Sequence, residues 1–326
     1  ITPAQAAELV RPGHALIASG SGGGHAVPEA LLAALGDRFR RTGAPAGLTL
    51  AHVVGIGDRA ARGAAHLAQP GMVRRLITSA LVDAPAFIPM AMADEVEAYT
   101  LPQGVLSQLM REMAAGRPGL ITRTGLHTFV DPRQAGALQG GTATEPRVEV
   151  IRIDGQDWLR FLPFHIDVAF LRGTTADEDG NISMEQEAIP GEMLSTAQAV
   201  RRMGGIVVVQ VKRLARRGTL RARDVRIPGI LVDHVVVVPD QRQTYATDYD
   251  PSYAGELRVP LDSIRPLPFG ARKIIARRAA MELRPGTICN IGAGISTGIP
   301  AVAAEEGILD RIILTNEQGF IGGAPL

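Results

Sequence analysis

The chain has little of what several classes of protein require. Its 326 residues include one cysteine, Cys289, which excludes an intramolecular disulfide. Aromatic residues make up 4% and the net charge is +1, which argues against a surface that binds nucleic acid. The longest apolar runs, such as 206–209 and 235–238, are too short to span a membrane, and the first residues lack the pattern of a signal peptide. We therefore expect a cytoplasmic protein with no nucleic-acid or membrane partner.

Several site signatures are also absent. The sequence contains no G-x-x-x-x-G-K-[ST] phosphate loop and no G-x-S-x-G nucleophile elbow. Its histidines show no metal-ligand spacing. The acidic segment 174–181 lacks the alternating oxygen ligands and the terminal Glu of a calcium loop, so Asp179-Gly180 is better interpreted as a turn between two strands. We expect no metal site.

Strand-like and helix-like segments alternate along most of the chain. The segment 232–238 is apolar apart from Asp233 and His234, and we interpret it as a strand that is buried on both faces. Strands are expected at 14–19, 48–54, 148–153, 168–171, 205–211, 232–238 and 287–291, and helices at 28–39, 191–203 and 273–283. This alternation predicts an α/β fold with a mainly parallel sheet covered by helices.

An internal repeat indicates two related halves. A strand, a glycine loop, a proline and an alanine-rich helix follow one another twice. The corresponding residues, all at one offset, are Gly20 and Gly292, Gly22 and Gly294, and Pro28 and Pro300. We expect two open, mainly parallel sheets, one in residues 1–268 and one that begins at 269 after a proline-rich linker. Because 269–326 is shorter than a complete α/β domain, we expect this second half to be truncated, cleaved or disordered beyond residue 326.

The two glycine loops have three possible roles. The first, with Gly22, Gly23 and Gly24, resembles a dinucleotide fingerprint but has His25 at its last position, and no suitably placed acidic residue ends the next strand. Either loop could instead be a tight turn without a ligand. The third role, which we favour, is to receive an anionic or thioester ligand on main-chain amides and a helix N-terminus.

Two polar residues lie beside expected elements, one after a strand and one before a helix. Glu317 follows the β-type run 312–315 and precedes a glycine-rich stretch, so it is expected at the carboxyl edge of a sheet, where ligands bind in open α/β folds. Gln103 lies just before a helix, where it could cap the helix or donate to a developing oxyanion. The basic segment 212–226 is either a solvated or subunit-facing surface or an attractor of anionic ligands.

Segments along nearly the whole chain, in one order, carry a family resemblance. They are 20–25, 101–104, 124–132, 166–169, 172–177, 211–213, 274–283 and 315–323. Together they resemble the family I coenzyme A transferases of the single-chain acetate/propionate type, which are related to the 3-oxoacid CoA-transferases.

The resemblance implies roles for particular residues. Glu317 would be the catalytic nucleophile and Gln103 an oxyanion donor, and the segment 290–298, with Asn290, Gly292, Gly294 and Gly298, would face coenzyme A. At 296–299 this chain has Ser-Thr-Gly-Ile where relatives often have Pro-Glu-Gly-Val. The implied reaction moves CoA between a short-chain acyl-CoA and a free carboxylate through a glutamyl-CoA thioester, with CoA as substrate and no tightly bound cofactor. The implied assembly is a homo-oligomer, or a complex with a separate chain that carries the second half.

Other functions stay open at this point. A sugar-phosphate isomerase or a ligand-sensing domain can share the broad architecture, because fold alone does not decide function. A nicotinamide dehydrogenase and a non-catalytic regulatory subunit are further alternatives.

Overall fold

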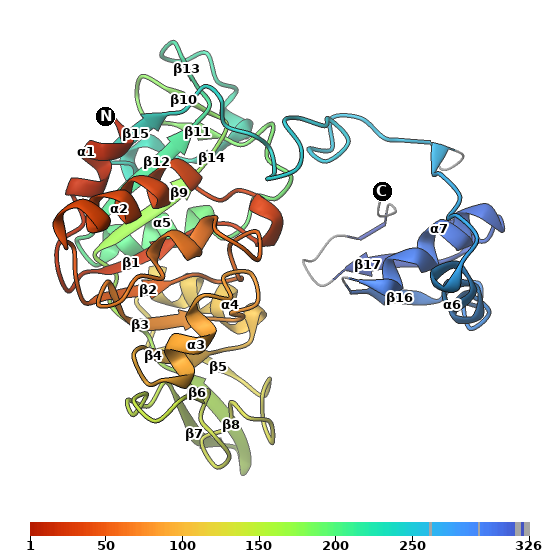
Figure 1. Ribbon diagram of the computed structural model, residues 1–326, viewed down its shortest axis with the longest axis horizontal. Helices are drawn as coiled ribbons and strands as arrows, with labels where there is room; N and C mark the ends of the chain where they lie inside the picture. Colours follow the sequence, from red (N-terminus) through yellow and green to blue (C-terminus); the bar gives the residue numbers. More distant parts are fainter. Residues whose placement is uncertain (261–262, 293, 317–320, 323–326) are drawn as a thin grey trace. The chain divides into compact units, whose positions relative to one another are not determined.

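The structure is a computed structural model that describes residues 1–260, 263–292, 294–316 and 321–322 (Figure 1). The chain divides into two units, Ile1–Gly255 and Glu256–Leu326. The prediction that a second coenzyme A transferase half begins at 269 stays a prediction.

Unit 1 is built on a mainly parallel sheet, as the alternation predicts. Within the described residues this sheet has eight strands in the order β15-β12-β9-β1-β2-β3-β4-β6. The strands are β1 (Ala15–Ala18), β2 (Leu48–Ala51), β3 (Val73–Thr78), β4 (Glu97–Thr100), β6 (Leu138–Gln139), β9 (Val168–Arg172), β12 (Ile206–Val211) and β15 (His234–Val237). Only β6 runs antiparallel to its neighbour. The carboxyl ends of the other strands therefore meet at one edge, where the candidate site lies.

Helices cover both faces of this sheet, and a separate apolar core fills each side. The helices of unit 1 are α1 (Pro3–Glu8), α2 (Glu29–Thr42), α3 (Phe87–Met92), α4 (Gln103–Ala114) and α5 (Met193–Arg202). On one side α1, α2 and α3 bury Leu16 and Phe170 of the sheet, and on the other α4 and α5 bury Ile17 and Leu171 (Figure 1). Neighbouring residues of a strand thus enter opposite cores, as the period of two requires. None of the helices in the described ranges is long and apolar enough to cross a membrane.

Two smaller sheets extend unit 1. One, in the order β5-β8-β7, is antiparallel and contains β5 (Leu120–Thr122), β7 (Val148–Ile153) and β8 (Gln156–Phe161). The other, in the order β13-β10-β11-β14, contains β10 (Thr175–Asp177), β11 (Ile182–Ser183), β13 (Arg213–Ala215) and β14 (Val225–Ile227). The expected turn at Asp179-Gly180 is confirmed, because it joins the antiparallel pair β10 and β11.

The interpretation of 232–238 as a strand buried on both faces is wrong. The strand β15 lies at the edge of the large sheet, and Val236 is its one buried residue. Val237 is 36% exposed. A mainly apolar run cannot distinguish a central strand from an edge strand, since pairing depends on the rest of the chain.

The described residues of unit 2 form a smaller parallel pair of strands and two α-helices. These elements are α6 (Ala271–Ala280), β16 (Ile288–Ile291), α7 (Gly298–Glu305) and β17 (Ile313–Asn316). β16, the short 3-10 helix η6 (Ile295–Thr297) and α7 follow one another as β1, the 3-10 helix η1 (Gly22–Gly24) and α2 do in unit 1. The order of elements in the sequence repeat is therefore present in both units.

Candidate active site

The first glycine loop lies at the carboxyl end of β1, as predicted. Gly23 and Gly24 adopt φ angles of 74° and 87°, in the left-handed region that favours glycine. The amide of Gly23 donates to the carbonyl of Gly57, 3.0 Å away, in the loop after β2. The loops that follow β1 and β2 are thus joined through their main chains.

Glycines also let a third loop approach, and this was missed in the sequence. A Cβ at Gly22 would lie 2.8 Å from Oδ1 of Asp83, and one at Gly55 would lie 2.4 Å from its Oδ2. A Cβ at Gly57 would lie 2.1 Å from the main-chain oxygen of Asp83. Asp83 follows β3, so its side chain and carbonyl fill space that the glycines of the other two loops leave open. The sequence signal for this approach is the spacing Gly55-x-Gly57, directly after the expected strand 48–54.

A buried histidine links the ends of β2 and β3. Nδ1 of His52 lies 2.7 Å from the carbonyl of Val54 and 2.8 Å from Oγ1 of Thr78. Burial lowers the pKa of His52 to about 4, although the bond to Val54 opposes this shift. The ring is therefore neutral near pH 7, and because a carbonyl only accepts, Nδ1 carries the proton. Its Nε2 is buried and has no partner among the described residues.

Gln103 is the first residue of α4 and lies at the carboxyl end of β4. The main chain leading to it is anchored by the amide of Leu101, which donates to the carbonyl of Thr78, 2.9 Å away. Pro102 occupies the N-cap and makes no side-chain capping bond. Within the described residues, no hydrogen bond is formed by the Gln103 side chain. Its half-buried amide is therefore available to a ligand at this edge of the sheet.

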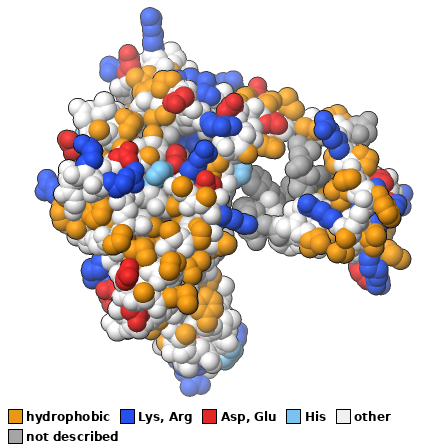
Figure 2. Space-filling view, viewed as in Figure 1, with side chains coloured by type: hydrophobic (Ala, Val, Ile, Leu, Met, Phe, Trp, Pro, Cys, Tyr) orange, Lys and Arg blue, Asp and Glu red, His pale blue; other side chains and the backbone are white. Residues whose placement is uncertain are grey.

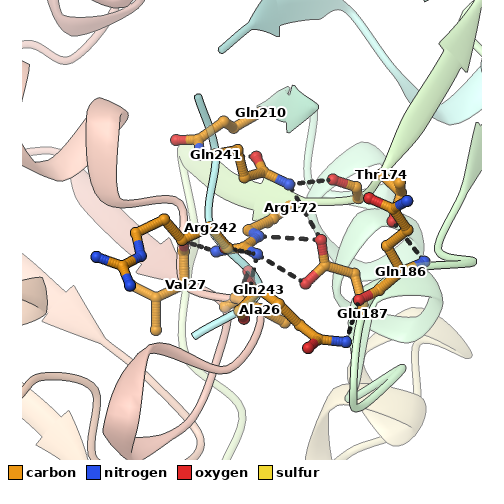
Figure 3. A network of polar contacts seen from close by, with 12 residues as sticks. Ala26, Val27, Arg172, Thr174, Gln186, Glu187, Gln210, Gln241, Arg242 and Gln243 are labelled. Carbon is orange, nitrogen blue, oxygen red and sulfur yellow. Dashed lines mark hydrogen bonds and ion pairs between the residues drawn. The ribbon is translucent and has the colours of Figure 1, made fainter. Parts of the chain in front are cut away.

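A buried polar network ties the far end of the glycine loop to distant segments (Figure 3). Arg172, the last residue of β9, donates from Nη1 to the carbonyl of Val27 and from Nη2 to that of Arg242. Gln241 donates to Glu187 over 3.0 Å and accepts from Gln210 over 2.8 Å. No sequence pattern pointed to this network, because its members are far apart in the chain.

The second glycine turn, in unit 2, follows β16. Asn290 is an exposed residue of β16, and Ile291 pairs with Asn316, the last residue of β17. Beyond the adjacent residues, no atom of the described residues would lie within 4 Å of a Cβ at Gly292 or Gly294. Gly292 thus begins its turn beside the carboxyl end of β17, which is the strand that precedes Glu317 in the sequence. Glu317 itself lies outside the described residues.

The residues that depart from the family pattern stabilise this turn. Ser296 Oγ donates to the carbonyl of Gly292 over 2.8 Å, and Thr297 Oγ1 to that of Gly294 over 2.7 Å. Gly298 begins α7, where a Cβ would approach that of Ala276 in α6 to 3.2 Å. Its buried position against α6 favours a packing role, and the expected contact with coenzyme A stays a prediction.

Three of the seven basic side chains in 212–226 form ion pairs within the described residues. Arg213 and Arg217 pair with Glu185 and Asp179 of neighbouring segments, and Arg221 pairs with Asp224 of the same segment. Figure 2 shows Lys and Arg side chains beside acidic ones on the face in view. The side chains of these three ion pairs are exposed, which is typical of a solvated surface. A search of the described ranges finds no group of histidine, cysteine and carboxylate side chains that could hold a metal ion.

The fold and the glycine loops at the carboxyl edge define the class of protein. The family model described as "Coenzyme A transferase" matches residues 1–238, and the chain belongs to that family. It is 42% identical over 328 residues to the caffeate CoA-transferase of Acetobacterium woodii, covering 100% of this chain and 62% of that protein. It is 40% identical to the acetate CoA-transferase YdiF of Escherichia coli K12, covering 93% of this chain and 57% of the relative.

A solved structure supports the same grouping. The acyl-CoA transferase YdiF of E. coli O157:H7, in a thioester complex with CoA, matches with a TM-score of 0.94 and 38% identity. The match covers 100% of this chain and 62% of that one. The chain thus spans less than two thirds of the length of these relatives. The isomerase and ligand-sensing alternatives receive no support from these matches.

Proposed function

We propose that this protein transfers coenzyme A between a short-chain acyl-CoA and a free carboxylate. The observation that carries the proposal is the register of β16 and β17, in which Ile291 pairs with Asn316. With that register, the glycine turn after β16 begins beside the strand that leads into Glu317. The similarity to CoA-transferases over the whole chain supports the proposal.

Glu317 is the proposed nucleophile. Its carboxylate attacks the thioester carbonyl and expels CoA thiolate, which leaves a mixed anhydride between Glu317 and the acyl group. The thiolate then attacks the glutamyl carbonyl, so that a glutamyl-CoA thioester forms and the original carboxylate departs. An acceptor carboxylate reverses these steps and leaves as the new acyl-CoA. Covalent catalysis divides one difficult exchange into easier steps.

The other predicted site residues have supporting roles in this proposal. Gln103 donates its amide to the tetrahedral oxyanion, which requires that its nitrogen come within about 3 Å of that oxygen. Gly22, Gly23 and Gly24 in unit 1, and Asn290, Gly292, Gly294 and Gly298 in unit 2, receive the substrate and coenzyme A. CoA is a substrate, and we propose no tightly bound cofactor.

The wider setting is part of the same proposal. Residues from 269 on begin a second coenzyme A transferase half, and the protein acts in the cytoplasm in short-chain fatty acid metabolism. It assembles as a homo-oligomer, or with a separate chain that completes this second half.

Mass spectrometry of the full-length protein tests the proposal. After incubation with acetyl-CoA or propionyl-CoA, we expect a covalent CoA adduct that maps to Glu317. Borohydride reduces such a thioester, so it should inactivate only protein that was first treated with acyl-CoA. The absence of an adduct, or an adduct at Glu282, Glu305 or Glu306, would refute the mechanism.

A further inference from the structure

Tyr245, near the end of unit 1, lies directly on the first glycine loop. Its amide donates to the carbonyl of Gly23 over 2.8 Å. A Cβ at Gly24 would lie 2.7 Å from Cγ of the Tyr245 ring, so only glycine fits beneath that ring. The glycine loop and the Tyr245 ring are therefore complementary in shape.

The hydroxyl of Tyr245 reaches the other end of the loop. It donates to Oε2 of Glu29, the first residue of α2, over 2.7 Å. The same oxygen accepts from the amide of Gly63, and Oε1 lies 2.7 Å from Nε2 of His66. Tyr245 thus contacts the glycine loop through its main chain and the helix after the loop through its side chain.

The charges at this contact keep the hydroxyl as the donor. Burial favours the neutral form of Glu29, but the hydrogen bonds from His66 and Tyr245 outweigh it and lower the pKa of Glu29. Burial, and then the negative charge of Glu29, raise the pKa of Tyr245. An ionised carboxylate therefore faces a protonated phenol near pH 7. The Arg62 guanidinium lies 5.3 Å from the centre of the Tyr245 ring, and this cation–π contact also helps to hold the ring in place.

The segment that carries Tyr245 is itself held firmly. Gln243 accepts from the amide of Asp250 over 2.8 Å and donates to the carbonyl of Gln186 over 2.9 Å. Thr244 Oγ1 accepts from the amide of Thr247 over 2.9 Å. These bonds fix the position of Tyr245, and Tyr245 can therefore hold the glycine loop in place.

We propose that Tyr245 is a positioning residue that sets the main chain of the glycine loop for substrate binding. It acts through Gly23, Gly24 and Glu29 and does not itself contact the substrate. This inference rests on the proposed function only where it concerns substrate binding. The positioning of the loop is a property of the protein without substrate.

Hydrogen exchange of the full chain without substrate tests the positioning directly. The variant Tyr245→Phe keeps the ring and the amide and loses one hydrogen bond, so amides in 20–29 should exchange about 2- to 10-fold faster. Tyr245→Ala also removes the ring and should have a larger effect on the same segment. Tyr253→Phe is the matched control, because Tyr253 is 37% exposed and its removed hydroxyl should leave 20–29 unchanged.

Unchanged exchange at 20–29 in both Tyr245 variants would overturn the inference. Tyr245→Ala could accelerate exchange throughout unit 1 by destabilising it as a whole, and in that case the result for Tyr245→Phe is decisive. Faster exchange of Tyr245→Phe confined to 20–29 would support the proposal. Faster exchange of Tyr245→Phe throughout unit 1 would reject it. Because no substrate is present, this result does not depend on whether the protein transfers CoA.

Kinetics of the full-length protein test the consequence for binding. We expect Tyr245→Phe to raise KM for the acyl-CoA several-fold and to change kcat by less than about 2-fold. The reason is that a displaced loop weakens binding of the ground state and the transition state equally. A loss in kcat at unchanged KM would contradict a positioning role in binding. An inactive wild-type protein would refute the proposed function and leave the exchange result valid.

Discussion

Arg172 and Glu187 form a two-point ion pair inside unit 1. Nε of Arg172 lies 3.1 Å from Oε1 of Glu187, and Nη2 lies 3.0 Å from Oε2. The two residues are 4% and 6% exposed. Burial raises the pKa of Glu187, and the positive charge of Arg172 opposes that shift. The pair also directs the remaining Arg172 donors toward the glycine loop and the segment that carries Tyr245 (Figure 3).

Removing the arginine of this pair should destabilise unit 1 strongly. Arg172→Met leaves the Glu187 carboxylate buried without its partner, which we expect to cost about 3–5 kcal/mol in the free energy of unfolding. Urea unfolding followed by circular dichroism measures this loss. Arg201→Met is the control, because its ion pair with Asp233 is partly exposed and should contribute about 1 kcal/mol or less. Equal losses in the two variants would contradict the assigned role.

Gln103→Ala should lower kcat without unfolding the protein. An oxyanion donor typically contributes about 100- to 1,000-fold in kcat, while the ground-state substrate is bound nearly as well. The thermal midpoint should stay within about 2 °C, because no bond of the Gln103 side chain is lost within the described residues. Gln108→Ala, at an exposed position of the same helix, is the control and should retain full activity. A kcat for Gln103→Ala equal to that of this control would exclude the donor role.

Glu317→Ala should abolish CoA exchange and the covalent adduct. Removal of a nucleophile eliminates the covalent route, whereas removal of an orienting group only slows it. Glu317→Asp should also be very poor, since one methylene fewer misplaces the attacking oxygen. Exchange between acetyl-CoA and a labelled carboxylate measures both variants. Glu282→Ala is the control and should remain active, because Glu282 is exposed and lies just after α6. Substantial activity in Glu317→Ala would refute the mechanism.

Two glycine substitutions should change stability in opposite directions. In Gly57→Ala the new methyl group would lie 2.1 Å from the carbonyl oxygen of Asp83, at a φ of 155°. We expect a loss of more than about 2 kcal/mol in the free energy of unfolding. Gly104→Ala has open space in the first turn of α4 and should gain up to about 1 kcal/mol. Denaturant titration measures both, and equal effects would show that the loop after β2 can move away from Asp83.

Acid should weaken unit 1 through His52. Its pKa falls from the ordinary 6.5 to about 4 on folding, so below pH 6.5 the unfolded chain binds a proton that the folded protein excludes. Stability from this group is therefore complete above pH 6.5 and declines as the pH falls toward 4, by up to about 3 kcal/mol. Urea unfolding between pH 7.5 and 4.5 measures the slope. In His52→Asn, the free energy of unfolding should depend less on pH than in the wild type. His165→Asn is the control, because His165 is exposed and its replacement should keep the wild-type dependence. The same pH dependence in the wild type and in His52→Asn would contradict the role of His52.

Part of the candidate site could be predicted from local patterns. The first glycine loop was expected at the end of a strand and Gln103 just before a helix, and both lie at the carboxyl edge of the parallel sheet. Such predictions succeed because a strand, a glycine turn and a helix leave periodic signals within a few residues of one another. The role of Gln103 and that of Glu317 stay predictions, and Glu317 lies outside the described residues.

By itself, the sequence determined the α/β class, the mainly parallel sheet and the repeated strand–turn–helix order. It could not indicate the central or edge position of 232–238, nor why Gly24 and Gly57 must be glycine. Those features depend on what approaches from elsewhere, as when Tyr245 meets Glu29 across 216 residues of sequence. Contacts between distant side chains leave no periodicity in the chain, so only the tertiary structure decided which residues hold the glycine loop.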